Sequence, residues 1–396
     1  MSSYWKQLGV ALDNRTAYVV LNLLPGIGPL RVNHLLSLFG TPQAVLAAKR
    51  AELARVPGIG DRLAGVLHHW EQNCSLENEL ALVKKAGVVL VTREDDDYPA
   101  LLREIHDPPL CLYVRGNASL LGKLGVAIAI VGSRRTTHYG IRVAENLATA
   151  AALAGWPVVS GLARGIDTVA HQATLSANGK TIAVLGSGLA HVYPQQNIDL
   201  GRRIAESAGA LLSEFPMLYR PDKRTFPMRN RVISGMTQGT VVVEAGLRSG
   251  SLITAGQALE QNRQVFAVPG KVDSPQSRGC HALLKDGARL VENFDDILDE
   301  FSQLPGLSRG SITPERAGVG TPATTENPGA DLQLSDTERK LLSFLGANEA
   351  SIDALISALG LPTPAVLGAI VTLEMRHIIR QLPGRRIVLN NRALAG

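Results

Sequence analysis

The segment from Lys223 to Arg231 combines residue types that could bind a nucleic acid. It reads Lys-Arg-Thr-Phe-Pro-Met-Arg-Asn-Arg, so lysine and arginine side chains flank one phenylalanine and one asparagine. Cations spaced in this way can contact phosphates, and a flat ring offers a surface on which a base can stack. In isolation the same residues are typical of an ordinary solvated charge cluster. The elements around the segment decide between these two interpretations.

Short apolar runs alternate with longer helical patterns from about residue 87 onward, and most runs end in glycine or serine. The predicted strands are Val126–Val131, Pro157–Val159, Thr181–Leu185, Ala210–Glu214, Thr240–Glu244 and Gln264–Val268. Continuous apolar runs of this length are typical of a parallel sheet that is buried on both faces. We therefore expect an α/β domain with an extended Rossmann-like, doubly wound, mostly parallel sheet. Its loops gather at the carboxyl edge, where such folds bind ligands.

Several glycine turns should open helices at that edge. They are Gly132–Arg135, Ser160–Asp167 and Gly250–Ser251. Exposed amides and hydroxyls in such turns can hold phosphate oxygens, and Arg134 adds a positive charge. Any one of these loops alone is more often only a tight turn. Several of them on one edge, joined by the segment 223–231, favour a groove for a nucleic acid.

The first segment of the chain contains an internal repeat. Leu24–Gly28 recurs as Val56–Gly60, and each copy leads into a helical pattern, at 30–39 and at 62–70. A glycine turn at a helix start leaves free amides aimed at an anion. The spacing resembles the helix-hairpin-helix motif of SAM-like helical domains, which grips nucleic-acid backbones. A small helical bundle with tight turns is an equally good interpretation, because Arg31 and Arg62 are the main cations in these repeats.

The last part of the chain differs in composition from the rest. Residues 302–334 are rich in Pro, Gly, Thr and Ser, which predicts a flexible linker. Three helices are expected at 336–345, 352–359 and 363–376, and a β-hairpin at 378–382 and 386–389, which together outline a winged helix. The leading turns of the expected recognition helix, at 363–376, lack the polar residues that read base edges. The arginines cluster near the hairpin instead, which favours protein contact or auxiliary backbone binding; they are Arg376, Arg380, Arg385, Arg386 and Arg392.

Length and composition set the broad class. We expect the 396 residues to divide into a helical domain at 1–86, a Rossmann-like domain at 87–301, the linker, and a winged-helix-like domain at 335–396. The balance of 40 basic against 35 acidic residues gives a net charge of +5, a weak indication of a polyanionic partner. Three widely separated cysteines predict neither a disulfide framework nor a metal site. With no secretory core and no membrane span, a cytoplasmic protein is expected.

Enzymatic and cofactor functions have weaker support. Gly186–His191 begins like a dinucleotide fingerprint, but His191 replaces its third glycine, so no cofactor is expected. The main alternative is a nucleoside-monophosphate glycosidase of the lysine-decarboxylase-like type, with Glu244 as the carboxylate and Arg248 as the phosphate ligand. That group's Pro-Gly-Gly-x-Gly-Thr loop is missing. A duplex-reading transcription factor would depend on the last domain alone.

The motifs as a set resemble the DNA-processing protein A family, also called Smf. The residues that carry the resemblance are Ile130–Arg134, Ser160–Asp167, Ala183–Gly188, Lys223–Arg231 and Glu244–Ser251. The similarity runs from about residue 98 to residue 301, and the flanking helical and winged-helix-like segments agree with the arrangement of that family.

The resemblance implies a protein without a catalytic site or a metal that binds single-stranded DNA without sequence preference. It also implies a homodimer that loads the recombinase RecA onto incoming strands during natural transformation and displaces single-strand-binding protein. Arg134 and Lys223 would be the main phosphate contacts and Phe226 the base-stacking residue. Ser160 and Gly161 would contribute hydroxyl and amide contacts. For Arg229 and Asn230, strand contact and support of the loop both remain open.

Overall fold

The computed structural model describes residues 12–302 and, beyond them, positions 337, 339, 341, 350–351, 355, 366, 369–370, 373, 379–382 and 386–389. The chain divides into two compact units, Met1–Arg316 and Ala317–Gly396. Except for Ser302, the expected linker lies outside the described residues. The finer division at 86, 301 and 334 stays a prediction.

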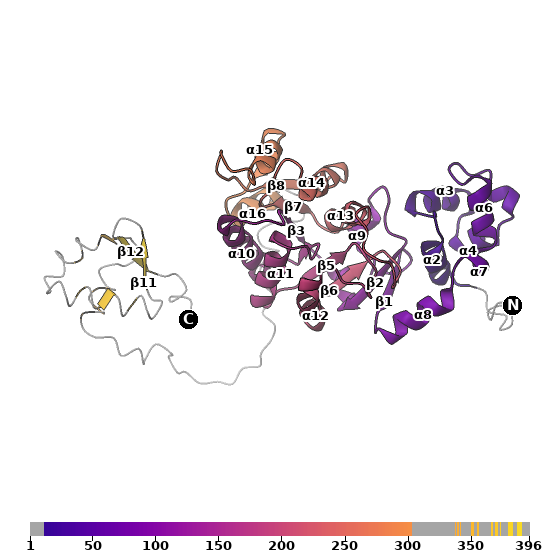
Figure 1. Cartoon of the computed structure of the whole chain (residues 1–396), viewed down its shortest axis with the longest axis horizontal. Coiled ribbons are helices and arrows are strands. Elements are labelled where there is room, and N and C mark those ends of the chain that lie inside the picture. Colours follow the sequence, from indigo (N-terminus) through magenta and orange to yellow (C-terminus); the bar gives the residue numbers. More distant parts are fainter. Residues whose placement is uncertain are drawn as a thin grey trace. The chain divides into compact units, whose positions relative to one another are not determined.

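A single twisted sheet organises the first unit, with strand order β1-β2-β6-β5-β4-β3-β7-β8-β9 (Figure 1). The strands from β6 to β9 in this order are parallel, while β1 and β2 pair antiparallel at one end. The bounds are β1 (Val89–Thr92), β2 (Cys111–Gly116), β3 (Ile128–Val131), β4 (Val158–Ser160), β5 (Thr181–Leu185), β6 (Ala210–Ser213), β7 (Gly239–Val242), β8 (Gln264–Ala267) and β9 (Arg289–Leu290). The predicted Rossmann-like, mostly parallel sheet is thereby confirmed.

The six predicted strands correspond to β3 through β8, with ends that differ by one or two residues. The sequence pattern did not single out β1, β2 or β9. Strand β9 consists of two exposed residues, so it has no buried apolar run to reveal it. Strand β1 is only partly buried, since it lies at the end of the sheet.

Helices cover both faces of the sheet because side chains along each buried strand alternate between them. In β3, Ile128 and Ile130 pack with α10, α11 and α16, whereas Ala129 and Val131 pack with α13 and α14. The helices and 3₁₀ turns of this part are α9 (Ala100–Arg103), η1 (Ala118–Lys123), α10 (His138–Leu153), α11 (Ile166–Ser176), η2 (Gln195–Asn197), α12 (Ile198–Glu206), α13 (Thr225–Gly235), α14 (Gly250–Glu260), α15 (Arg278–Lys285) and α16 (Phe294–Ser302).

A helical segment precedes the sheet and shares a hydrophobic cluster with it. Its helices are α2 (Asn14–Leu23), α3 (Pro29–Phe39), α4 (Pro42–Ala47), α5 (Arg50–Leu53), α6 (Gly60–His68), α7 (Trp70–Asn73) and α8 (Leu76–Lys85). Two hydrogen bonds join it to the segment after β6: Asn22 Nδ2 donates to the Glu214 carbonyl at 3.1 Å, and the Met217 amide donates to Glu79 Oε1 at 2.7 Å. Within the described part of the chain, none of the helices combines the length and apolar character that crossing a membrane needs.

The two repeated glycine turns have the same backbone conformation. Gly26 and Gly58 both have φ of +78°, a region that favours glycine. Arg31 joins the turns, because its Nη1 donates to the Gly26 carbonyl at 2.8 Å and its Nε donates to the Gly58 carbonyl at 2.9 Å. The Arg31 guanidinium therefore has a structural role inside the repeat.

The second unit contains a small antiparallel sheet of order β10-β12-β11, formed by β10 (Ala350–Ser351), β11 (Ile379–Leu382) and β12 (Arg386–Leu389). Ile379 pairs with Leu389 and Leu382 with Arg386, which confirms the predicted hairpin. The bounds of the three expected helices lie outside the described residues. So do Arg376, Arg385 and Arg392 and the side chains of Arg380 and Arg386.

A buried histidine links α11 to the sheet. His171 Nδ1 lies 2.7 Å from Thr181 Oγ1, and that hydroxyl donates its proton to the Val158 carbonyl at 2.7 Å. Since the hydroxyl has only one proton, Nδ1 must carry the hydrogen of this contact. Burial, followed by the Arg229 cation, lowers the pKa of His171 to about 3.

This histidine should make the free energy of unfolding depend on pH. Between pH 6.5 and about 3 the unfolded chain binds a proton at His171 and the folded chain does not, so stability falls as the pH falls. From pH 6.5 to pH 5 the loss should be about 2 kcal/mol, at about 1.36 kcal/mol per pH unit. Urea unfolding of the wild type and of His171→Asn, which keeps a donor near Nδ1 but does not titrate, measures the difference. Equal pH dependence in the two proteins would contradict the assignment.

Candidate nucleic-acid interface

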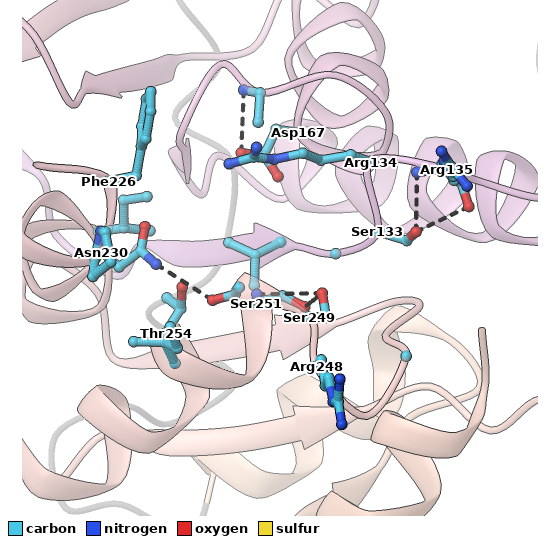
Figure 2. Close-up of a pocket in the computed structure, with 18 of the residues that line it drawn as sticks. Ser133, Arg134, Arg135, Asp167, Phe226, Asn230, Arg248, Ser249, Ser251 and Thr254 are labelled. Carbon is cyan, nitrogen blue, oxygen red and sulfur yellow. Dashed lines mark hydrogen bonds between the residues drawn. The ribbon is translucent and has the colours of Figure 1, made fainter. Parts of the chain in front are cut away.

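A cavity of about 850 Å³ lies at the carboxyl edge of the sheet (Figure 2). The turn after β3, the loop after β4, the segment that leads into α13 and the turn before α14 all contribute to its wall. Strand β3 stands between β4 and β7, and the chain leaves it toward β4 but later returns to its other side as β7. This reversal is the point at which open α/β sheets form a ligand-binding crevice.

The wall of the cavity is strongly cationic. Among the described residues that line it, five carry a positive charge and only Asp167 carries a carboxylate; the cations are Arg134, Arg135, Lys223, Arg229 and Arg248. All of these except Arg229 are exposed to solvent. Four accessible cations that surround one concave surface favour a ligand with several phosphates.

Ser160 and Gly161 lie beneath this wall and are engaged within the protein. Ser160 is fully buried, and its hydroxyl donates to the Ile130 carbonyl at 2.7 Å. The Gly161 amide donates to Asp167 Oδ2 at 3.0 Å, so a carboxylate of the chain already occupies this amide. The structure places both residues in the framework of the loop, and their direct contact with a strand stays a prediction.

Arg229 points into the protein rather than into solvent. Its Nη1 donates to the Gly161 carbonyl at 2.6 Å and also to the Val184 carbonyl, and only 4% of the residue is exposed. A Cβ at Gly161 would lie 2.5 Å from both Nη atoms, so glycine is required for this close approach. Burial lowers the pKa of Arg229 to about 10, while Asp167 opposes that shift. Arg229 thus fastens α13 to the ends of β4 and β5.

Asn230 lies at the wall of the cavity, next to Arg229. Its Oδ1 accepts from Arg229 Nε at 3.3 Å, and its Nδ2 lies 3.4 Å from the Gly250 carbonyl at the start of α14. The amide is partly buried and faces the turn that carries Arg248 (Figure 2). Asn230 thus supports the loop and lines the cavity, and its contact with a strand stays a prediction.

Asp167 holds the loop between β4 and α11 in place. Its Oδ2 accepts from the Gly161 amide and, at 3.3 Å, from the Ala163 amide. Burial raises the pKa of this carboxyl, and Arg229 is the main group that lowers it. The loop ends at Gly165, with φ of +82°, where a Cβ would lie 2.2 Å from the Ser133 carbonyl. The loops after β3 and β4 are therefore in direct contact.

Arg134, Phe226 and Tyr193 form a group at one end of the cavity. The Arg134 guanidinium carbon lies 5.7 Å from the centre of the Phe226 ring, as a cation–π pair does. The Tyr193 ring centre lies 5.7 Å from that of Phe226. Arg134 reaches toward Phe226, whereas Arg135 extends in another direction (Figure 2). Tyr193 is not among the site residues expected from the sequence, although an aromatic residue in a loop after a predicted strand could have indicated it.

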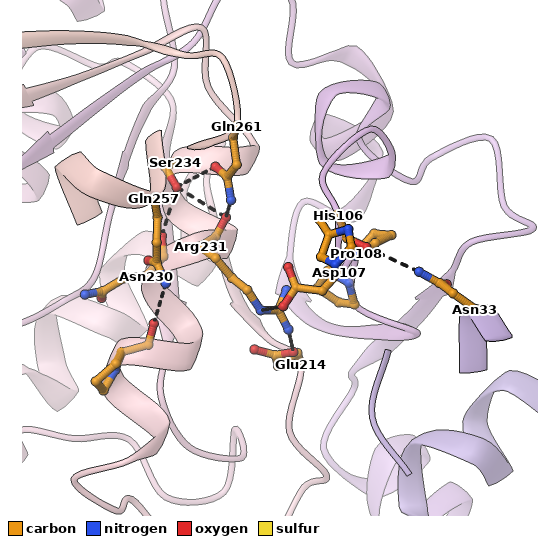
Figure 3. A network of polar contacts seen from close by, with 12 residues as sticks. Asn33, His106, Asp107, Pro108, Glu214, Asn230, Arg231, Ser234, Gln257 and Gln261 are labelled. Carbon is orange, nitrogen blue, oxygen red and sulfur yellow. Dashed lines mark hydrogen bonds and ion pairs between the residues drawn. The ribbon is translucent and has the colours of Figure 1, made fainter. Parts of the chain in front are cut away.

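Arg231 is the second cation of the segment 223–231 that points inward (Figure 3). Its Nε lies 3.1 Å from Asp107 Oδ2, and its Nη2 contacts Glu214 Oε2. On the other side, Gln261 Nε2 donates to the Arg231 carbonyl at 3.0 Å. Burial raises the pKa of Glu214 and Arg231 lowers it. The pair with Glu214 joins α13 to the end of β6, and the pair with Asp107 joins it to the loop before β2.

A smaller cavity of about 580 Å³ adjoins the same end of α13. Both glycine turns of the helical segment line it, together with Pro227, Met228 and Arg231. Pro227 also lines the larger cavity, so the two hollows share a wall. A contact of the glycine turns with a nucleic acid stays a prediction.

Glu244, the carboxylate of the glycosidase hypothesis, is engaged elsewhere. Its Oε2 accepts from the Thr137 amide at 3.0 Å and its Oε1 from the Thr137 hydroxyl at 2.5 Å, just before the start of α10. The residue is 3% exposed and does not line the larger cavity. Its position does not support a role as a general acid or base. Among the described side chains, no cluster of His, Cys, Asp and Glu could hold a metal ion.

Three family models match separate parts of the chain. The model described as DNA recombination-mediator protein A matches residues 89–302. A model of the DprA winged helix domain matches residues 325–385, and one of the SAM-like helix-hairpin-helix tandem matches residues 20–66. These ranges agree with the expected order of a helical, a Rossmann-like and a winged-helix part.

Similar proteins cover most of the chain. Protein Smf of Escherichia coli (strain K12) is 35% identical over 366 residues, which is 90% of this chain and 93% of that protein. DNA processing protein DprA of Bacillus subtilis (strain 168) is 42% identical over 228 residues, 58% of this chain and 76% of that protein. The X-ray structure of DNA processing protein A from Streptococcus pneumoniae superposes with a TM-score of 0.65 at 35% identity and covers 74% of this chain and 99% of that one.

The contrast between Arg229 and Arg134 gives a test of this geometry. Arg229→Ala would leave two buried carbonyls without donors, at about 1–3 kcal/mol each, so the free energy of unfolding should fall by at least about 2 kcal/mol. Arg134→Ala removes an exposed side chain and should change stability by less than about 0.5 kcal/mol. Urea denaturation of both variants measures the two values. Similar stabilities would show that Arg229 is not an anchor.

Proposed function

Since this chain belongs to the DNA recombination-mediator protein A family, we propose that it binds single-stranded DNA, without sequence preference, in the cavity at the carboxyl edge of its sheet. The observation that carries the proposal is the meeting of four exposed cations with two aromatic rings around one concave surface. Cations hold the phosphodiester backbone, and rings stack on bases.

Single strands fit this chemistry better than duplexes do. Stacking needs the face of a base to be free, and a duplex buries these faces between neighbouring base pairs. Every base has such a face, and every nucleotide carries the same phosphate, so neither contact selects a sequence. Arg134 and Lys223 bind phosphates, Phe226 contacts a base, and Asn230 lies close enough to assist. The cavity wall is supported from inside the protein by Arg229, Ser160 and Gly161.

We further propose that a homodimer presents the bound strand to RecA recombinase in place of single-strand-binding protein, during natural transformation. The family resemblance supports this step. We also propose that the helical part at 1–86, the Rossmann-like part at 87–301 and the winged-helix part at 335–396 are separate domains of a cytoplasmic protein. The position of Glu244 supports a binding role rather than an enzymatic one.

Reversal of one cationic charge tests strand binding. Lys223→Glu should lower affinity for oligo-dT at least tenfold and make the log–log salt slope shallower by about 0.7, because one phosphate contact is lost. Lys180→Glu is a matched control: Lys180 is exposed too but precedes β5, so it lies at the opposite edge of the sheet. Fluorescence anisotropy over a range of salt measures both variants. A salt-independent wild type, or equal effects of the two variants, would refute the cationic site.

The recombinase step needs a separate measurement. On single-stranded DNA coated with single-strand-binding protein, the full-length protein should shorten the lag before RecA filaments form, and Lys223→Glu should not. ATP hydrolysis by RecA reports filament formation over time. If the wild type binds oligo-dT but leaves the lag unchanged, strand binding stands and the loading role is wrong.

A further inference from the structure

Tyr193 lines the wall of the cavity at the carboxyl edge of the sheet. It lies in the loop between β5 and η2, and 45% of the residue is exposed. Its ring forms a tilted pair with Phe226, at an angle of 44°. We propose that Tyr193 is a second base-stacking residue. One base contacts Phe226, and the base of the adjacent nucleotide stacks on Tyr193. This inference rests on the proposed function and specifies how many bases the site holds.

The loop that carries Tyr193 is firmly held. The Gly188 amide donates to the Tyr219 carbonyl at 2.8 Å, and the Ala190 amide donates to the Met217 carbonyl at 3.1 Å. A Cβ at Gly188 would lie 2.0 Å from the Pro216 carbonyl oxygen, so the two segments are in close contact. Within the loop, the Ser187 hydroxyl donates to the His191 carbonyl at 2.7 Å. A ring on a loop fixed in this way loses little conformational entropy when a ligand binds.

Phe226 has less free surface than Tyr193. The residue is partly buried, and the Arg134 guanidinium lies over its ring. Gly186 packs against the ring, because a Cβ at that position would lie 2.8 Å from Phe226 Cδ1. Tyr193 is exposed, so it offers the larger accessible aromatic surface of the pair. A site with Phe226 alone would leave this surface unused.

The spacing of the two rings decides how bases can be arranged. A base between two rings needs a contact distance of about 3.5–4 Å on each side, or about 7–8 Å between ring planes. The ring centres of Tyr193 and Phe226 lie only 5.7 Å apart. A base therefore cannot enter between them, and a base that stacks on Tyr193 must use the ring face turned away from Phe226. The nucleotide next to the one that contacts Phe226 can then place its base on the exposed face of Tyr193.

Oligonucleotides with single abasic sites test this arrangement. In a short oligo-dT, an abasic site scanned along the strand should lower wild-type affinity at two adjacent positions, by roughly five- to hundredfold each. Tyr193→Leu should bind the intact strand more weakly by a similar factor and retain only one sensitive position. Tyr193→Phe should behave as the wild type does, because the ring is kept. Leucine fills much of the space of the ring, so melting temperatures should agree.

Tyr219→Leu is the matched control. Tyr219 is also 45% exposed and also pairs with a phenylalanine, Phe215, at 5.0 Å, but it does not line the cavity. Full affinity and two sensitive positions in Tyr193→Leu would overturn the inference, as would equal losses in Tyr193→Leu and Tyr219→Leu. In either case, salt-dependent binding by the wild type and its loss in Lys223→Glu would leave the proposed function intact. A wild type that does not bind oligo-dT would overturn both.

Discussion

The buried guanidinium of Arg229 fixes the geometry on which the rest of the site depends. It donates to carbonyls at the ends of two strands, 68 and 45 residues away in the chain. Helix α13 is thereby held against the carboxyl edge of the sheet, and the residues just before and within its first turn face the cavity. Because the cation is buried, its hydrogen bonds are shielded from solvent, and removal of either side leaves polar groups unpaired. The backbone that carries the exposed cations before this helix is therefore held in a fixed position.

A second buried arginine on the same helix extends this anchoring in another direction. Arg231 pairs with Asp107 and Glu214, and the Glu214 carbonyl accepts a hydrogen bond from Asn22 in the helical segment. The basic segment therefore combines exposed cations with buried ones. Lys223 precedes the helix and faces solvent, whereas Arg229 and Arg231 point into the protein. Exposed residues that border the cavity and buried residues that anchor the helix thus lie within nine positions.

Much of the fold could be predicted from the sequence, because buried parallel strands leave long apolar runs that end in glycine. The runs at 181–185 and 264–268 show this clearly, whereas the two exposed residues of β9 left no such pattern. The carboxyl edge was predictable as the place of the site for the same reason. Burial of Arg229 was not, since the carbonyls that it meets are distant in the chain. Tyr193 was missed because only the folded loop brings it to Phe226.

The contact between Gly161 and Arg229 limits which single substitutions this chain can accept. A side chain at position 161 would collide with the guanidinium unless the guanidinium moved. A smaller residue at position 229 would remove the hydrogen bonds that Arg229 donates to two carbonyls. A change at either position therefore alters the contact made by the other. A lineage that changes the two residues one at a time therefore passes through an intermediate of lower stability. Random mutagenesis should therefore seldom yield stable variants with a single substitution at either position.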